Sequence, residues 1–143
     1  MMTVVAVDES ERSQIANAIE TALLASLARS NTQAENDSFV LVHKGQSSAL
    51  TGGVTGSTSY GWLLIKTLWV DEMHRGGGLG KQLVLAAEGR ARETGCHSAW
   101  LDTSSETAHS FYSHLGYSDF GVLANEEDQP PSDHCRWFMK KAL

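Results

Sequence analysis

The sequence predicts a single mixed α/β domain over residues 1–143, and three observations support this. Strand-like and helical apolar patterns alternate along the whole chain, with no repeat and no long linker between them. The longest strand candidate, Trp62–Val70, is almost continuously apolar, which suits a central strand covered on both faces. A glycine-rich loop follows this strand directly and opens a helix.

The first half of the chain is expected to contain one helix and four strands. A helix begins at Asp8, because Asp8 and Glu11 have the spacing of a capping box and apolar residues then recur every four positions. Polar residues 29–38 are expected to form a loop. The strands are expected at residues 3–7, 39–43, 49–57 and 62–70, with turns at residues 44–47 and 59–61.

The second half is expected to contain two helices and three strands. A helix over residues 79–94 has a stripe of small and aliphatic side chains, and Gly95 ends it. Thr103 and Glu106 form a second possible capping box before a helix over residues 105–115. The remaining strands are expected at residues 97–103, 117–123 and 134–140, and the last two flank an acidic loop.

Composition excludes several classes of protein. A net charge of −6 disfavours a nucleic-acid-binding module, and it tilts the expected partner toward cations. No apolar run approaches the ~20 residues that cross a bilayer, and the N-terminus has no secretory pattern. Two separated cysteines and six scattered histidines show no metal-ligand spacing. We therefore expect a cytoplasmic protein without a metal, a membrane partner or a nucleic-acid partner.

The glycine-rich loop has the chemistry of an anion site. The first amides of a helix lack intrahelical acceptors and carry the positive end of the helix dipole, and glycines let them approach a phosphate. A Walker A loop does not fit, because Arg75 stands at its first glycine and Gln82 at its Ser or Thr. A dinucleotide fingerprint fails for lack of a later glycine. The spacing that fits is Arg-x-x-Gly-x-Gly, formed by Arg75, Gly78 and Gly80.

With this loop, and with TSSETAHSFYSHLGYSDFG further along, the sequence resembles the GNAT superfamily of N-acetyltransferases. The second segment is similar to the family's helix that ends in an aromatic pair and a Leu-Gly-aromatic turn. The resemblance covers most of the chain. It implies a mixed, mostly antiparallel central sheet with splayed central strands, flanked by helices. It also implies acetyl-CoA as co-substrate.

The resemblance also implies site residues. The main chain of Leu68, Trp69 and Val70 would pair with the pantetheine arm, and Tyr112 would protonate the departing thiolate. Ser105 stands where many members carry an Asn that contacts the pantetheine region. The pyrophosphate would be held by the loop and the helix start, at Arg75, Gly76, Gly77, Gly78, Leu79, Gly80 and Lys81.

A proton route for the acceptor is less clear. Many family members place a glutamate on the central strand, and Leu64 and its neighbours supply none. The nearest carboxylates in the expected layout are Asp71, Glu72 and Asp102. We also expect the acidic loop, residues 126–133, to border an acceptor pocket that favours cationic amines.

The resulting hypothesis is acetyl transfer from acetyl-CoA to a primary amine of a small molecule or protein, by direct attack in a ternary complex. The alternative is a non-catalytic acyl-CoA sensor or interaction module on the same fold, favoured by the missing glutamate and by Ser105. Transfer to oxygen, or of a longer acyl chain, also stays open. Family resemblance is compatible with a homodimer.

Overall fold

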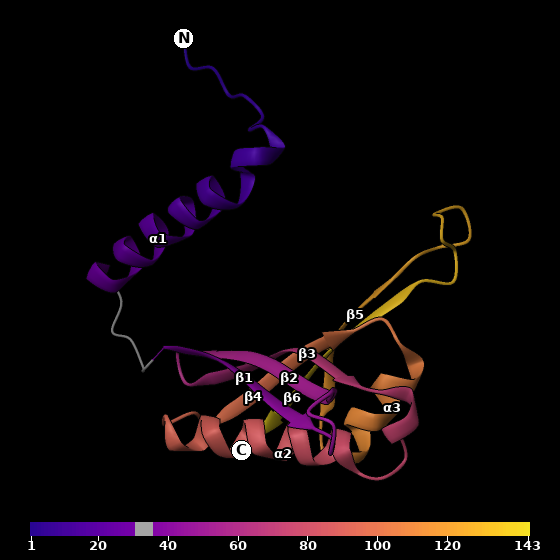
Figure 1. Cartoon of the computed structure of the whole chain (residues 1–143). Coiled ribbons are helices and arrows are strands. Elements are labelled where there is room, and N and C mark those ends of the chain that lie inside the picture. Colours follow the sequence, from indigo (N-terminus) through magenta and orange to yellow (C-terminus); the bar gives the residue numbers. More distant parts are fainter. Residues whose placement is uncertain (31–35) are drawn as a thin grey trace. The chain divides into compact units, whose positions relative to one another are not determined.

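The computed structural model describes residues 1–30 and 36–143 and contains two compact units, Met1–Gln33 and Ala34–Leu143 (Figure 1). The first unit consists of an irregular N-terminus, a short 3-10 turn η1 (Glu9–Glu11) and helix α1 (Arg12–Ser30). The predicted helix is confirmed, although the side chain of Asp8 makes no capping bond. The predicted strand at residues 3–7 is wrong. Its apolar residues have no second strand in this unit to pair with.

The predicted loop at residues 29–38 is shorter than expected where the structure describes it. Arg29 and Ser30 belong to α1, and the next strand already begins at Asp37. Residues 31–35 of that prediction lie outside the described residues.

The second unit contains a six-stranded sheet in the order β1-β2-β3-β4-β6-β5. Only β3 and β4 run parallel, and every other neighbouring pair is antiparallel, which confirms the expected mixed sheet. The strands lie within two residues of the predicted bounds. They are β1 (Asp37–Lys44), β2 (Leu50–Ser59), β3 (Trp62–Val70), β4 (Ser98–Thr103), β5 (Ser118–Ala124) and β6 (Cys135–Ala142).

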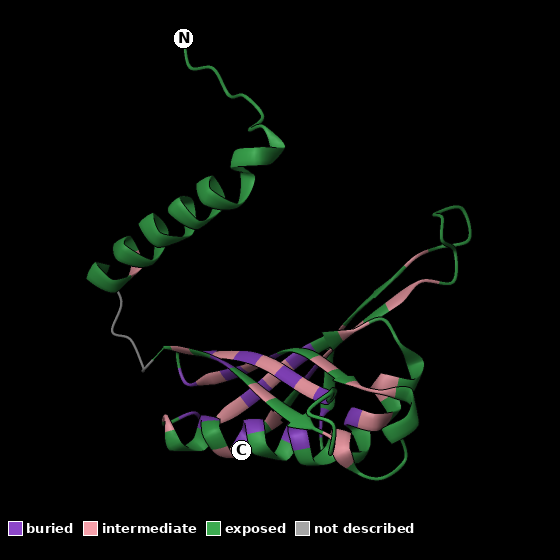
Figure 2. Cartoon of the chain, in the orientation of Figure 1, coloured by how far each residue is buried: buried purple, intermediate pink, exposed green. Residues whose placement is uncertain are grey.

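The core of this unit lies between the sheet and two helices, α2 (Leu79–Glu93) and α3 (Glu106–His114) (Figure 2). The predicted stripe of α2 is confirmed, since Leu83, Ala87 and Ala91 are buried. These side chains pack against buried residues of the strands, including Leu63 and Leu101. Burial of apolar surface on this scale is the main favourable contribution to folding.

Strand β3 carries one extra residue relative to β2. Ile65 pairs with Gly56 and Thr67 pairs with Thr55, so Lys66 has no partner in β2 and forms a bulge. At Gly56 an added Cβ would lie 2.7 Å from the Leu64 carbonyl oxygen, so only glycine allows this approach of the strands.

The bulge changes which side chains of β3 face the core. Leu63 and Ile65 are buried before it, whereas Leu68 and Val70 pack against the core after it and Trp69 is exposed. Pairing of β3 with β4 stops nearby: it covers only Trp62–Leu64, opposite Ser98–Trp100. The two strands therefore separate beyond Leu64, as the family resemblance implies.

The buried carboxylate of Glu88 connects α2 to β6 and to the turn that precedes β5. Glu88 is fully buried. Its carboxylate accepts a hydrogen bond from the Tyr117 hydroxyl at 2.9 Å and forms an ion pair with Lys141 Nζ at 2.8 Å. Burial and the Glu88 carboxylate raise the pKa of Tyr117, so this phenol remains a hydrogen-bond donor. The cluster therefore fixes α2 against β6 and the turn before β5.

The start of α3 differs from the sequence prediction. Ser105, not Thr103, is the N-cap, and its hydroxyl accepts from the Ala108 N–H at 3.2 Å. The Thr103 hydroxyl instead accepts from the Ser105 N–H. Capping-box spacing alone did not distinguish these two hydroxyl residues.

We expect Lys141→Met to lower the free energy of unfolding by about 3 kcal/mol, because the buried Glu88 loses its short ion pair and keeps only Arg92, whose Nη2 lies 3.9 Å from Glu88 Oε1. The matched control is Lys140→Met, at an exposed neighbour on β6, which should change stability by less than about 1 kcal/mol. Urea denaturation of both variants measures the difference. Equal losses would show that the Glu88 pair contributes nothing specific.

Candidate functional site

The loop between β3 and α2 is shaped by two left-handed glycines. Gly76 and Gly78 have φ angles of 84° and 86°, in the region that L-residues rarely adopt. An added Cβ at either position would meet nothing within 4 Å, so the backbone conformation, not space, requires glycine there. The loop follows a 3-10 turn, η2 (Glu72–His74), which Asp71 caps by accepting the Met73 N–H.

Helix α2 begins with open backbone donors. Its first bond runs from Gln82 N–H to Gly78 O at 3.0 Å, and Gly78 provides no side chain as a cap. The amides of Leu79, Gly80 and Lys81 therefore precede the intrahelical ladder. Such amides, with the positive end of the helix dipole, form a site for an anion.

Close packing fixes where this helix start lies. An added Cβ at Gly52 on β2 would lie 3.0 Å from Leu79 Cδ2, and one at Gly80 would lie 3.4 Å from Phe111 Cζ. The absence of side chains at Gly52 and Gly80 therefore lets the helix start approach both the sheet and α3.

The helix start opens onto a cavity of about 540 Å³, here called the main cleft. It lies between the end of β3, the glycine loop and the start of α3. Every residue predicted to bind the cofactor lines it except Gly77, and so do His74, Thr107, Ala108 and Phe111. The full lining is Leu68, Trp69, Val70, His74, Arg75, Gly76, Gly78, Leu79, Gly80, Lys81, Ser105, Thr107, Ala108 and Phe111.

Three of these four residues were not predicted as site residues. Ala108 and Phe111 have the helical spacing of a packing stripe in the sequence, and Thr107 carries no motif. Helical spacing from Ser105 places Ala108 on the same face. His74 was considered from the sequence as a phosphate contact because it precedes Arg75, with a surface histidine as the alternative.

Two predicted residues also have roles within the chain. Arg75 Nε donates to Val70 O at 2.9 Å, which holds its side chain at the end of β3, and its amide is directed to Glu72 O. The Ser105 hydroxyl accepts the cap bond of α3 but can still donate its own proton. Both residues nevertheless line the main cleft.

A second cavity, here called the inner cavity, measures about 270 Å³ and lies where β3 and β4 separate. It shares Leu68 and Ala108 with the main cleft, so the two spaces meet at these side chains. Its lining is Ile65, Lys66, Thr67, Leu68, Leu101, Asp102, Thr103, Ala108 and Tyr112.

Tyr112 belongs to the inner cavity and not to the main cleft. The side chain is nearly buried, at 6% exposure, and this burial raises the pKa of Tyr112 to about 12. The phenol is therefore protonated throughout the physiological pH range and can act only as a donor of its proton or a neutral acceptor.

The three carboxylates considered from the sequence differ in position. Asp71 accepts a hydrogen bond from His74 Nδ1 at 3.0 Å; this bond holds the pKa of Asp71 below its usual value. Glu72 lines neither the main cleft nor the inner cavity. Asp102 lines the inner cavity with Tyr112, and its Oδ2 lies 3.6 Å from Arg136 Nε.

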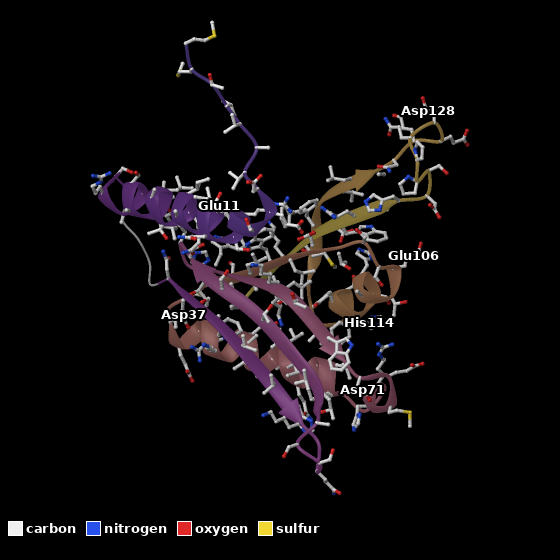
Figure 3. All side chains as sticks on the ribbon, turned by 45° about the horizontal axis from the view of Figure 1, so that its top comes forward. Glu11, Asp37, Asp71, Glu106, His114 and Asp128 are labelled. Carbon is white, nitrogen blue, oxygen red and sulfur yellow. The ribbon has the colours of Figure 1, made fainter. Side chains whose placement is uncertain are left out.

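The acidic loop does not border these spaces. Residues 126–133 lie between β5 and β6, at the tip of a hairpin that extends beyond the rest of the sheet, and Figure 3 shows Asp128 there, away from Asp71. None of them lines the main cleft or the inner cavity. The structure therefore does not support the expectation that this loop borders the acceptor pocket.

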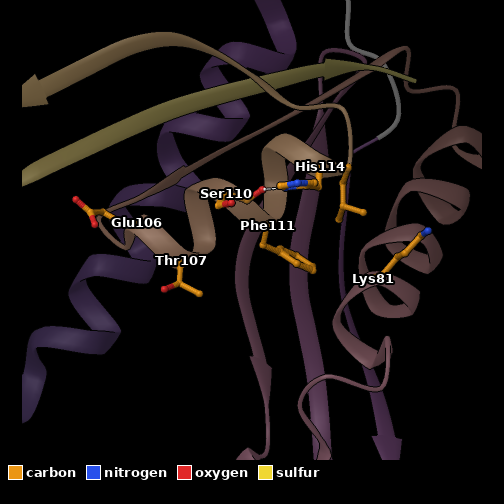
Figure 4. A pocket seen from close by; sticks show the side chains of 7 residues that line it. Lys81, Glu106, Thr107, Ser110, Phe111 and His114 are labelled. Carbon is orange, nitrogen blue, oxygen red and sulfur yellow. Dashed lines mark hydrogen bonds between the residues drawn. The ribbon is translucent and has the colours of Figure 1, made fainter.

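A third cavity, the outer groove, continues the main cleft between α2 and α3 (Figure 4). It measures about 690 Å³ and shares Lys81, Thr107 and Phe111 with the main cleft. On its α3 side, His114 Nδ1–H donates to Ser110 O at 2.7 Å. The main cleft thus shares lining residues with the outer groove on one side and with the inner cavity on the other.

Residues 5–117 match the Acetyltransferase (GNAT) family. The chain belongs to this family. It is 40% identical over 98 residues to the blasticidin-S acetyltransferase of Streptomyces morookaense, covering 68% of this chain and 70% of that protein. Its fold also matches an acetyltransferase of Bacillus cereus ATCC 14579, with a TM-score of 0.76 and 33% identity, covering 99% of this chain and 98% of the other.

A third similar structure is a nourseothricin acetyltransferase, with a TM-score of 0.66 and 26% identity, covering 74% of this chain and 65% of that one. More distant members of the same fold were solved with CoA or acetyl-CoA. The protein is therefore an acetyltransferase of the GNAT family, as the two sequence signatures indicated.

Two general properties complete the description of residues 1–30 and 36–143. Within them, no three His, Cys, Asp or Glu side chains are grouped in a way that could hold a metal ion. Of the helices in these same ranges, none combines the length and apolar character needed to cross a bilayer.

We expect Gly78→Ala to weaken CoA binding about fivefold, because alanine in the left-handed region costs roughly 1 kcal/mol. The control is Gly89→Ala, in the same helix, where an added Cβ meets nothing and the backbone is helical. That variant should gain about 0.5–1 kcal/mol of stability and bind CoA as the wild type does. Calorimetric titration with CoA tests both, and unchanged affinity in Gly78→Ala would contradict the assigned role of the loop.

Proposed function

We propose that this enzyme transfers the acetyl group of acetyl-CoA directly to a primary amine of a small cationic acceptor in a ternary complex. The observation that carries the proposal is the meeting of two cavities at Leu68 and Ala108. One contains the open amides of a helix start, and the other contains Tyr112 and Asp102. An anionic cofactor and an amine can thus approach the same point from opposite sides.

The cofactor fits the main cleft by charge and by hydrogen bonding. The amides of Leu79, Gly80 and Lys81 hold the diphosphate, and the side chains of Lys81 and Arg75 add positive charge. The edge of β3 that faces β4 is unpaired beyond Leu64, so Leu68 and Val70 offer backbone groups to the pantetheine amides. The outer groove accommodates the nucleotide end of a molecule longer than the cleft itself.

Tyr112 stabilises the departing sulfur by donating a hydrogen bond. Full proton transfer from a phenol of pKa about 12 to a thiolate whose conjugate acid has a pKa of about 8.5 is uphill by roughly 5 kcal/mol. A phenol with the ordinary pKa of about 10 would transfer its proton more easily, but burial raises the pKa of Tyr112 to about 12. Donation without complete transfer still stabilises the negative charge that develops on the sulfur.

Asp102 provides the carboxylate that β3 lacks. Among the described residues it is the one carboxylate in the lining of the inner cavity, which also includes Lys66, and its Oδ2 lies 3.6 Å from Arg136 Nε. An acceptor ammonium can pair with Asp102 and then lose its proton through it or through water. Deprotonating such an ammonium group at neutral pH costs roughly 4–5 kcal/mol, so a nearby group that takes up the proton lowers the barrier.

The names of two similar proteins suggest which acceptors to test first. Two of them are named for the antibiotics blasticidin-S and nourseothricin. We therefore take antibiotics with free amines as the first acceptors to test, and a panel of polyamines, amino acids and peptide N-termini as the second. A non-catalytic sensor loses its main argument, because Asp102 supplies a carboxylate in the inner cavity.

Replacing Tyr112 with Phe should lower kcat about a hundredfold with every acceptor that the wild type uses, with no change in CoA affinity. The reason is the loss of one hydrogen bond to the sulfur in the transition state. Thiol release from acetyl-CoA measures the rate, and Tyr60→Phe, on the β2–β3 turn, is the control. A Tyr112→Phe enzyme as fast as the wild type would refute the assigned role.

Asp102→Asn should raise the acceptor KM about tenfold while leaving the KM for acetyl-CoA unchanged, since a hydrogen bond to a charged group contributes about 1.5 kcal/mol. The matched control is Asp128→Asn in the hairpin tip, which should leave both constants as they are. An effect of Asp128→Asn without one of Asp102→Asn would restore the acidic loop as the acceptor site. Absence of thiol release with any amine would refute the proposed function itself.

A further inference from the structure

We propose that His74, oriented by Asp71, binds the diphosphate of the cofactor in its protonated form and makes cofactor affinity depend on pH. This inference rests on the proposed function, because it requires the diphosphate to occupy the main cleft. It assigns a role to a residue outside the Arg-x-x-Gly-x-Gly motif.

Hydrogen bonds of Asp71 to β2 and to the 3-10 turn fix the position of the His74 imidazole. The Asp71 N–H donates to Thr51 O on β2 at 2.8 Å, which anchors the residue at the end of β3. Its Oδ2 accepts from the Met73 N–H at 3.2 Å and from His74 Nδ1–H at 3.0 Å. One carboxylate oxygen thus holds both the 3-10 turn and the ring.

This arrangement leaves one ring nitrogen for the cleft. Because Nδ1 is directed to Asp71, Nε2 lies on the opposite side of the imidazole, and within residues 1–30 and 36–143 it has no hydrogen-bond partner. His74 lines the main cleft together with Arg75 and Lys81. Nε2 is therefore the free polar atom of this ring, in a side chain that lines the same cleft as the helix start with the open amides.

His74 is the imidazole in the lining of the main cleft, and imidazole is the side chain whose ordinary pKa lies between pH 5 and 8. Arg75 and Lys81 are the cationic residues of this lining. Asp71 remains a carboxylate, since the His74 hydrogen bond holds its pKa low. Glu72 is the other acidic residue on the same turn. His43 on β1 also contacts Thr51, because its Nδ1–H donates to Thr51 Oγ1, but His43 does not line the main cleft.

The sign of the pH effect follows from the proton count. In neutral His74, Nδ1–H donates to Asp71 and Nε2 presents a lone pair, which repels phosphate oxygens. In protonated His74, Nε2–H donates to the phosphate while Asp71 balances the ring charge. Bound diphosphate therefore raises the pKa of His74, and affinity rises as pH falls through that pKa.

The test is calorimetric titration with dephospho-CoA between pH 5.5 and 8.5. Dephospho-CoA lacks the 3′-phosphate, whose second pKa of about 6 would otherwise add its own pH dependence. For the wild type, the Kd should be about five- to tenfold lower at pH 5.5 than at pH 8.5, equivalent to an upward pKa shift of His74 near one unit. His74→Gln should give a flat profile, and the control His43→Gln should retain the wild-type profile.

Three outcomes would overturn the inference. Wild-type and His74→Gln proteins with the same pH profile would do so while leaving the proposed function intact. So would a pH effect that appears with CoA but disappears with dephospho-CoA, because the effect would then come from the 3′-phosphate and not from the diphosphate. Failure of the wild type to bind CoA at any pH would remove the proposed function as well.

A second readout does not depend on a variant. In an NMR titration of the wild-type protein, saturation with dephospho-CoA should raise the pKa of His74 by about one unit and leave that of His43 unchanged. Asp71→Asn should reduce that shift, because the ring loses both its orientation and its balancing charge. An unchanged His74 pKa in the saturated wild type would overturn the inference.

Discussion

The separation of β3 from β4 is the constraint on which the rest of this structure depends. Parallel pairing of the two strands ends at Leu64, and two residues later Lys66 bulges out of register with β2. Without this break the strands would continue side by side, and their hydrogen bonds would fill the space that is now the inner cavity. The gap exposes backbone groups in the middle of a sheet, where they are normally paired.

An open gap in a sheet must be supported by the structure around it. Here α2 lies against the sheet through Leu83, Ala87 and Ala91, and Glu88 connects it to Lys141 on β6. This scaffold holds the start of α2, where the amides are unpaired, beside the end of β3. A buried ion pair is weak evidence for net stability, but breaking one half of it is costly. The cluster therefore fixes the position of the helix more than it adds to total stability.

Much of the fold and part of the site were predictable from sequence because their signals are local. The bounds of β3 follow from a continuous apolar run, and the loop from glycines at required left-handed positions. Signals that need tertiary context were missed. The apolar run at residues 3–7 did not reveal whether a partner strand was present. The bulge at Lys66 has no sequence signature. The sequence therefore did not show that β3 and β4 separate into a cavity that Asp102 and Tyr112 both line. The sequence shows that residues 126–133 are acidic, but it does not show how far this loop lies from the main cleft and the inner cavity.

The bulge also separates the order of residues in β3 from the faces that they occupy. Side chains alternate along a regular strand, but two successive side chains, Lys66 and Thr67, are exposed here because Lys66 is the extra residue. Deleting Lys66 would restore regular alternation, so Leu68 and Val70 would still face the core and Trp69 would still face outward. A substitution at Lys66 or its loss can therefore change the local backbone without exchanging the side chains that form the wall of the site.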